Sequence, residues 1–201
     1  MLEFVSYDPS MSLMKYIFVD LDECVLHSNF LGAHFNPGAK KDRVIAKATK
    51  VYGPVFELDR ELYTTKMRPG ALDLLRRLRE IYGNEYVRVL TSSVTSYANK
   101  NNEIHGFGFR PDQIFAREDM NKMNFGIKEK IIPFIPGRVA LIDNLPPRDN
   151  QGKLEYLHPL LDRGFVSYVT VTEFWGYEDD YPFDDKYISE IVERIEDGFA
   201  S

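Results

Sequence analysis

Two carboxylates with the spacing of a catalytic pair, Asp20 and Asp22, directly follow a short apolar run. Acids this close repel each other unless a cation or a shared proton compensates, so the pair predicts either a bound Mg²⁺ or one raised pKa. With a phosphate ester as substrate, Asp20 can attack phosphorus while Asp22 protonates the leaving oxygen and later deprotonates water. An Asp-x-Asp pair by itself more often caps a turn, so its meaning depends on the rest of the chain.

Further polar residues stand where later apolar runs end. Thr91 and Ser92 follow the second run and offer hydroxyl donors beside an expected helix start, a position that receives phosphate oxygens well. Asp143 and Asn144 follow the third run and offer hard oxygen ligands. Lys128 lies upstream of the third run, where a cation can neutralise the nucleophile and the transferring phosphoryl group.

The apolar runs predict buried β-strands, because they are short and several are rich in β-branched and aromatic residues. They cover residues 16–19, 87–90, 139–142 and 166–171. Helical patterns lie between and after them. One opens at Pro69, stops at Gly83 and contains Leu72, Leu75, Leu78 and Ile81. Another contains Ile188, Ile191, Val192 and Ile195. This alternation predicts an α/β fold with a doubly wound parallel sheet, whose carboxyl edge would gather the polar residues.

Residues 43–67 interrupt the alternation. Four short segments at residues 44–46, 51–52, 55–58 and 62–65 are separated by turn signals at Gly53-Pro54 and Asp59-Arg60. This spacing predicts a small antiparallel β insertion between the first strand and the first long helix. The chain of 201 residues is expected to form one domain over residues 1–201 that carries this insertion.

The composition of the chain narrows the kinds of site, compartment and partner that are expected. A single cysteine, Cys24, excludes an intramolecular disulfide and a multi-cysteine zinc site. Neither a leader sequence nor a run of about 18 apolar residues is visible, so a cytoplasmic or otherwise intracellular protein without membrane association is expected. The net charge of -6 does not favour nucleic acid as a partner, although residues 40–68 hold eight lysines and arginines against four acids.

The order Asp-x-Asp, Thr, Lys and Asp-Asn resembles that of the haloacid-dehalogenase (HAD) superfamily phosphatases. The finer similarity is to the FCP/SCP group, also described as NLI-interacting-factor-like, the phosphatases of the RNA polymerase C-terminal domain. Their first motif, D-L-D-E-T-L-V-H-S, is here Asp20-Leu-Asp-Glu-Cys-Val-Leu-His-Ser28. Other segments follow in the order of that family over roughly residues 14–147, namely Lys66-Met-Arg-Pro-Gly70, Leu90-Thr-Ser-Ser93 with Tyr97-Ala98 after it, Phe115-Ala-Arg-Glu118, Lys128 and Leu141-Ile-Asp-Asn144. Cys24 departs from the family threonine, and similarity fades after Asn144.

The resemblance implies a role for each matched residue. Asp20 becomes the nucleophile that forms an aspartyl-phosphate, and Asp22 the general acid and base. Thr91 and Lys128 would hold phosphoryl oxygens, with Arg117 as a further phosphate contact. The nearby Lys122 and Lys130 are set aside on spacing and family register alone.

The resemblance also implies a magnesium site. Its ligands would be the Asp20 carboxylate, the main-chain carbonyl of Asp22 and Asn144, with Asp143 either a ligand or the partner of one. Such an oxygen-rich, partly hydrated site suits Mg²⁺.

Several functions remain open on the sequence alone. The leading hypothesis is a protein phosphoserine/phosphothreonine phosphatase whose substrate peptide lies beside the β insertion, because too few residues separate Thr91 from Lys128 for a large lid. The alternatives are a phosphatase of nucleotides or other small molecules, a phosphatase of polynucleotide ends, and a catalytically inactive module that binds phosphopeptides. A thiol phosphatase is disfavoured, because the residue six positions beyond Cys24 is Phe30 rather than arginine. Oligomeric state is not indicated.

Overall fold

The computed structural model describes residues 14–33, 43, 45–47, 49–50, 53–119, 138–145, 166–176 and 182–200. Within them, five parallel strands form the central sheet in the order β6-β5-β1-β7-β8. Their bounds are Lys15–Val19 for β1, Val87–Leu90 for β5, Ile114–Phe115 for β6, Arg138–Asp143 for β7 and Val166–Thr170 for β8. The four strands expected from the apolar runs are confirmed, and β6 is an additional one.

The strand order contains a reversal at β1. From β1 the chain moves outward to β5 and β6, and it then returns to place β7 and β8 on the other side of β1. This is the doubly wound arrangement, in which the carboxyl ends of the strands on the two sides of the reversal border a crevice. The fold class expected from the sequence is therefore confirmed.

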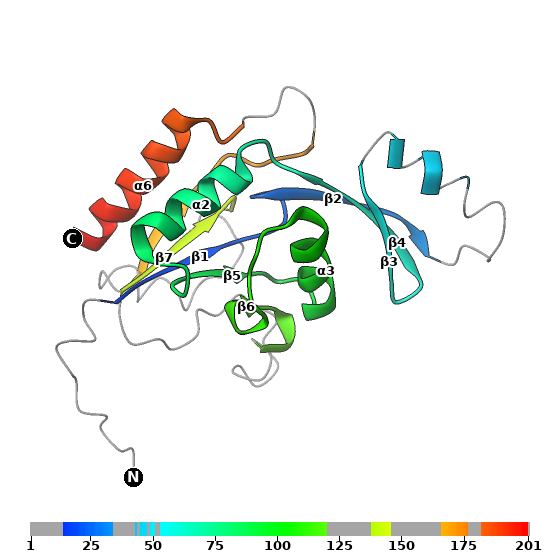
Figure 1. Cartoon of the computed structure of the whole chain (residues 1–201), viewed down its shortest axis with the longest axis horizontal. Helices are drawn as coiled ribbons and strands as arrows, with labels where there is room; N and C mark the ends of the chain where they lie inside the picture. The colour runs from blue at the N-terminus through cyan, green and yellow to red at the C-terminus, as the bar shows by residue number, and fades with distance from the viewer. Residues whose placement is uncertain are drawn as a thin grey trace, which may run out of the picture.

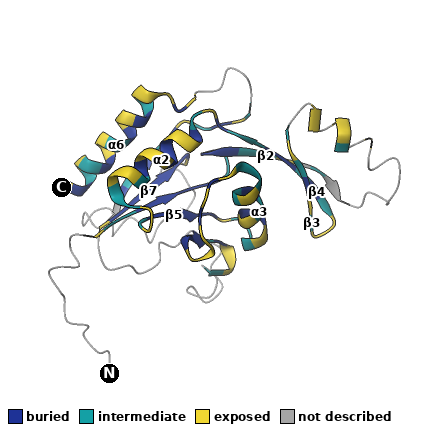
Figure 2. Cartoon of the chain, viewed as in Figure 1, coloured by how far each residue is buried: buried dark blue, intermediate teal, exposed yellow. Residues whose placement is uncertain are grey.

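Two helices cover one face of the sheet side by side, as Figure 1 shows. Helix α2, Ala71–Tyr82, packs on β1 and β5, and helix α6, Asp185–Ala200, packs on β7 and β8. The side chains of Ile17 and Val19 join the core under these helices. Phe18 points to the opposite face and is fully buried as well, so the sheet has the two buried faces of a parallel α/β sheet (Figure 2).

The two predicted helices exist, but the expected face of α2 is partly wrong. Leu72 and Ile81 are exposed. Three residues rotate about 300° around the helix axis, which is about 60° short of a full turn. Leu72 and Ile81 are three such steps apart, so they lie on opposite sides of the helix. The buried stripe comprises Ala71, Leu74, Leu75 and Leu78. In α6 the predicted face is confirmed, with Ile188, Ile191 and Ile195 buried and Val192 packed against the core.

A second, antiparallel sheet has the order β2-β4-β3 and lies beside the central sheet (Figure 1). Its strands are β2, Leu26–Ala33, β3, Val55–Leu58, and β4, Glu61–Met67. The expected antiparallel insertion is thus present, but it recruits β2 from the segment directly after Asp22. The expectation of a strand at residues 44–46 is wrong at the two of them that are described, because Ile45 and Ala46 are helical.

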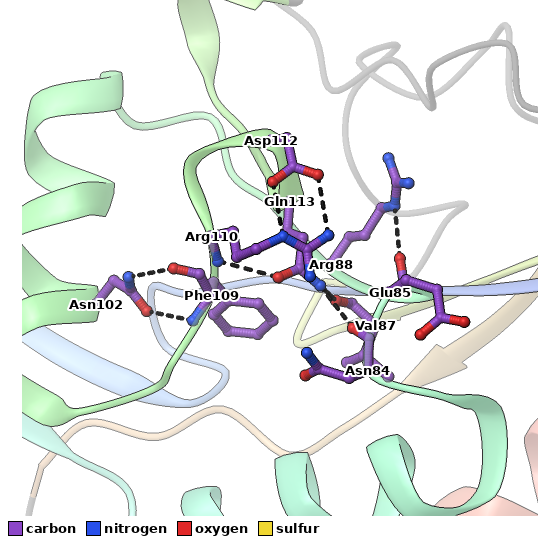
Figure 3. A network of polar contacts seen from close by, with 9 residues as sticks. All are labelled: Asn84, Glu85, Val87, Arg88, Asn102, Phe109, Arg110, Asp112 and Gln113. Atoms are coloured by element: carbon purple, nitrogen blue, oxygen red, sulfur yellow. Dashed lines mark hydrogen bonds and ion pairs between the residues drawn. The ribbon is translucent and has the colours of Figure 1, made fainter.

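The short strand β6 is aligned by side chains rather than by an apolar pattern. The buried amide of Gln113 donates to the carbonyls of Asn84 and Val87 at 2.6 and 3.1 Å (Figure 3). Asn102 of helix α3, Thr95–His105, exchanges two hydrogen bonds with the main chain of Phe109. These contacts fix the loop before β6, and thereby the path of the residues that follow it. Among the described residues, no helix has the length and apolar character needed to cross a membrane.

Candidate active site

The carboxyl ends of three neighbouring strands bring together the predicted polar residues. Asp20 directly follows β1, Thr91 directly follows β5, and Asp143 is the last residue of β7. Asp20 is 4% exposed, and Thr91 and Asp143 are each 1% exposed. Three buried polar side chains at the reversal of a doubly wound sheet form the expected position of a ligand site.

Asp20 and Asp143 lie next to each other across the pair β1 and β7. The main-chain amide of Asp20 donates to the carbonyl of Ile142 at 2.9 Å, and Val19 pairs with Ile142 in the register of the two strands. Neighbouring strands are about 4.8 Å apart, so two carboxylates are buried at closely spaced positions. Two carboxylates this close repel each other when both are charged, and a cation between them would lower that repulsion.

These residues fit a magnesium ion. Within the described residues no group of three or more His, Cys, Asp or Glu side chains could hold a metal. Two carboxylates supplemented by neutral oxygens are the alternative, and Asn144, 5% exposed, directly follows Asp143. Hard oxygen donors in small number, with water completing the shell, are the set that Mg²⁺ prefers.

Tyr168 of β8 faces the same acids and was not singled out from the sequence. Its hydroxyl donates to the carbonyl of Leu145 at 2.6 Å. Burial raises the pKa of Tyr168, and the charges of Asp143 and Asp20 raise it further. No sequence signal could have revealed this residue, because it lies within an apolar run that reads as an ordinary buried strand.

Asp22 lies beyond β1 at the entrance to the small sheet, where it forms a bridge with Leu26. Its Oδ1 accepts hydrogen bonds from the hydroxyls of Ser28 at 3.3 Å and Tyr97 at 2.5 Å. Its Oδ2 accepts one from the hydroxyl of Ser93 at 2.7 Å. Ser28, Ser93 and Tyr97 lie in segments that match the family, but no role at Asp22 was assigned to any of them from the sequence. The hydroxyl-rich run after β5 was a further signal for Ser93.

The turn that carries Asp22 is held in an unusual backbone conformation. Glu23 has a φ of 60°, which is uncommon for a residue other than glycine. Its amide donates to the carbonyl of Leu26 at 2.6 Å, and its carbonyl accepts from the amide of Phe174 at 2.7 Å. Cys24 in the same turn is fully buried, which leaves its thiol inaccessible to a substrate.

Of the predicted phosphate contacts, Thr91 and Ser92 lie on the loop after β5, and Arg117, which follows β6, contacts that loop. Arg117 donates its amide to the carbonyl of Ser93 at 2.9 Å and its Nε to the carbonyl of Ser92 at 2.7 Å. The exposed guanidinium of Arg117 is therefore fixed against the segment that contains Thr91. The hydroxyl of Thr91 accepts from the amide of Ser93 at 3.2 Å, which tightens this loop.

The start of helix α3 is capped by a carboxylate from a later segment of the chain. Both the amide and the hydroxyl of Thr95 donate to Oε2 of Glu118 at 2.8 Å. Glu118 thus satisfies a donor at the first turn of this helix. Lys128, Lys122 and Lys130 lie outside the described residues.

Two solved structures share the fold of this chain. One is Fcp1, described as an essential RNA polymerase II CTD phosphatase, with 15% sequence identity, a TM-score of 0.50, and coverage of 94% of this chain and 50% of that one. The other is fission yeast Fcp1 bound to beryllium fluoride, with 15% identity, a TM-score of 0.51, and coverage of 94% and 51%. The resemblance seen in the sequence is confirmed at the level of the fold.

The chain spans about half the length of these two structures. No protein-family model and no curated protein sequence matches it.

Proposed function

We propose that this chain is a magnesium-dependent phosphomonoester hydrolase that forms an aspartyl-phosphate on Asp20. The observation that carries the proposal is the buried Asp20 beside Asp143 at the reversal of the sheet, with Asp22 held by three hydroxyls at the entrance. The fold shared with Fcp1, a CTD phosphatase, supports the same reaction class.

The proposed reaction has two steps. A carboxylate oxygen of Asp20 attacks phosphorus, the bond between phosphorus and the leaving oxygen breaks, and Asp22 gives that oxygen a proton. Water then attacks the aspartyl-phosphate, Asp22 takes its proton, and inorganic phosphate leaves as the Asp20 carboxylate is restored. Thr91, Ser92, Arg117 and Lys128 would bind the phosphoryl oxygens.

Magnesium would be bound by the Asp20 carboxylate, the Asp22 carbonyl and Asn144, with Asp143 binding either the metal or one of these ligands. When bound, Mg²⁺ would neutralise charge on the phosphoryl group and so allow two anions to approach each other. The burial of Asp20 and Asp143 on neighbouring strands supports this role, because two carboxylates this close repel each other when charged and a cation between them would lower that repulsion.

We propose phosphoserine and phosphothreonine in proteins as the substrate class. The small sheet starts at Leu26, four residues beyond Asp22, and its Ser28 donates to the Asp22 carboxylate, so the sheet borders the site at the side of the general acid. A peptide lying along that sheet would bring its phosphate to Asp20. That Fcp1 acts on a protein domain of RNA polymerase II agrees with this choice.

Hydrolysis of p-nitrophenyl phosphate with Mg²⁺ or EDTA tests the reaction class. Asp20→Asn is expected to lower turnover at least about a thousandfold, because it removes the nucleophile. Asp73→Asn is the matched control, since Asp73 lies exposed on α2 in an ion pair with Arg76. Phosphopeptides, nucleotides and 3′-phosphorylated oligonucleotides then separate the substrate classes. Absence of turnover on every substrate by folded protein with bound Mg²⁺ would favour the binding module.

Beryllium fluoride offers a readout that needs no substrate, because it mimics a phosphoryl group on a carboxylate. With Mg²⁺ it is expected to raise the thermal unfolding midpoint of the native chain and of Asp73→Asn. Asp20→Asn should show no such rise. An equal rise in all three proteins would place the ligand away from Asp20.

A further inference from the structure

The carboxylate of Asp22 is held from three separate elements. Ser28 belongs to β2, Ser93 to the loop after β5, and Tyr97 to α3. The contact from Tyr97 is the shortest of the three, with 2.5 Å between its hydroxyl and Oδ1. A carboxylate on a short side chain otherwise rotates readily about its terminal torsion, so these contacts fix the direction in which each oxygen points.

The ring of Tyr97 is itself fixed by the small sheet. Tyr97 is buried, and its ring lies 6.1 Å from Phe56 and 5.9 Å from Tyr63, measured between ring centroids. Phe56 and Tyr63 stack on each other across β3 and β4 at 5.8 Å. Asn101, one turn later on α3, donates to the carbonyl of Tyr97 at 3.1 Å. The antiparallel sheet therefore sets the position of a hydroxyl that touches Asp22.

We propose that Tyr97 is a positioning residue for proton transfer, which holds Oδ1 of Asp22 so that Oδ2 faces the leaving oxygen of the substrate. This inference rests on the proposed function and deepens it. Tyr97 donates to Oδ1, whereas the Ser93 hydroxyl at Oδ2 can turn from donor to acceptor. Oδ2 is therefore the oxygen that can carry the transferred proton without losing a partner.

A pair of substrates with different leaving groups tests the role. p-Nitrophenolate leaves without protonation, whereas phenolate needs more help from an acid, and the two phosphate esters are otherwise similar in size. The ratio kcat/KM reports the step in which the leaving group departs. Tyr97→Phe is expected to lower kcat/KM roughly tenfold on phenyl phosphate and less than about twofold on p-nitrophenyl phosphate.

A second variant and a control make the comparison specific. Ser93→Ala removes the contact at the other oxygen and should show the same dependence on the leaving group. Tyr82→Phe removes a hydroxyl that donates to the carboxylate of Glu196 at 2.7 Å and should change neither ester. Both tyrosine variants keep their rings, and unfolding midpoints check that all three variants are folded.

The outcomes separate this inference from the proposed function. If Tyr97→Phe lost activity equally on both esters, or on neither, the positioning role would be overturned while hydrolysis through Asp20 stood. If the native chain with Mg²⁺ hydrolysed neither ester, the proposed function would fail and this inference with it.

Discussion

At the scale of single residues, the acids of the site could be predicted and their partners could not. Asp20 and Asp22 stand out because two carboxylates follow an apolar run. Tyr97 lies in a segment that matches the family, but its contact with Asp22 could not be predicted from that match, and Tyr168 lies in an ordinary apolar run. The partner of a tyrosine hydroxyl depends on which elements meet in three dimensions. The assigned roles of Thr91, Lys128 and Arg117 remain predictions of the resemblance.

Arg68 is a second residue whose role only the structure reveals. It is fully buried, and its Nη1 donates to the carbonyls of Cys24 at 3.2 Å and Thr172 at 2.6 Å. Its guanidinium carbon lies 4.0 Å from the ring centroid of Phe183. Arg68 thereby connects the turn that carries Asp22 to the loop after β8, and its hydrogen bonds to main-chain carbonyls offset part of the cost of burying its charge.

Arg68→Met tests this connection by keeping the volume and removing the donors. The free energy of unfolding, measured in urea, is expected to fall by about 3 kcal/mol, because two buried carbonyls lose their partner. The control Arg77→Met, on the exposed face of α2 and 3.7 Å from Glu80, is expected to change it by less than about 0.5 kcal/mol. Equal effects of the two substitutions would contradict a structural role for Arg68.

At the scale of elements, the strands that carry apolar runs were predicted well, including β8 at one edge of the described sheet. Their apolar runs are long enough to be distinctive, whereas β6 has only Ile114 and Phe115 and depends on Gln113 for its alignment. Strand β2 was missed because its sequence, LHSNFLGA, has no regular alternation. Pairing with β4, rather than the local sequence, determines that this segment is a strand.

The start of helix α2 depends on a close approach of two segments. Gly70 precedes the helix with a φ of +80°, and a Cβ there would lie 2.0 Å from the carbonyl oxygen of Phe183. The amide of Phe183 donates to the carbonyl of Pro69 at 2.8 Å, so the two segments cannot separate without losing a hydrogen bond.

Gly70→Ala is therefore expected to lower the free energy of unfolding by more than about 3 kcal/mol, through both the backbone conformation and the clash. Gly106→Ala is the matched control, because Gly106 has a φ of +66° but no atom within 4 Å of the added Cβ. It should cost only the conformational term of about 1 kcal/mol. Similar losses in urea unfolding for both variants would show that the close approach to Phe183 does not matter.

At the scale of the whole molecule, the topology follows from the alternation of strands and helices. The reversal at β1 places Asp20 between the strand that ends at Thr91 and the strand that ends in Asp143, although these residues are far apart in sequence. The small sheet forms one side of the site. It contacts Asp22 directly through Ser28, and indirectly because it packs against Tyr97 of α3, whose hydroxyl contacts Asp22. The bounds of the small sheet could not be predicted, because pairing between distant segments determines them.

The central claim is that phosphoryl transfer passes through Asp20. The native chain is mixed with Mg²⁺ and p-nitrophenyl phosphate, quenched in acid within one turnover, and digested for mass spectrometry. We predict one phosphoryl group on the peptide that contains Asp20, lost with hydroxylamine and absent from Asp20→Asn. Turnover without this label, or a label on another residue, would contradict the account.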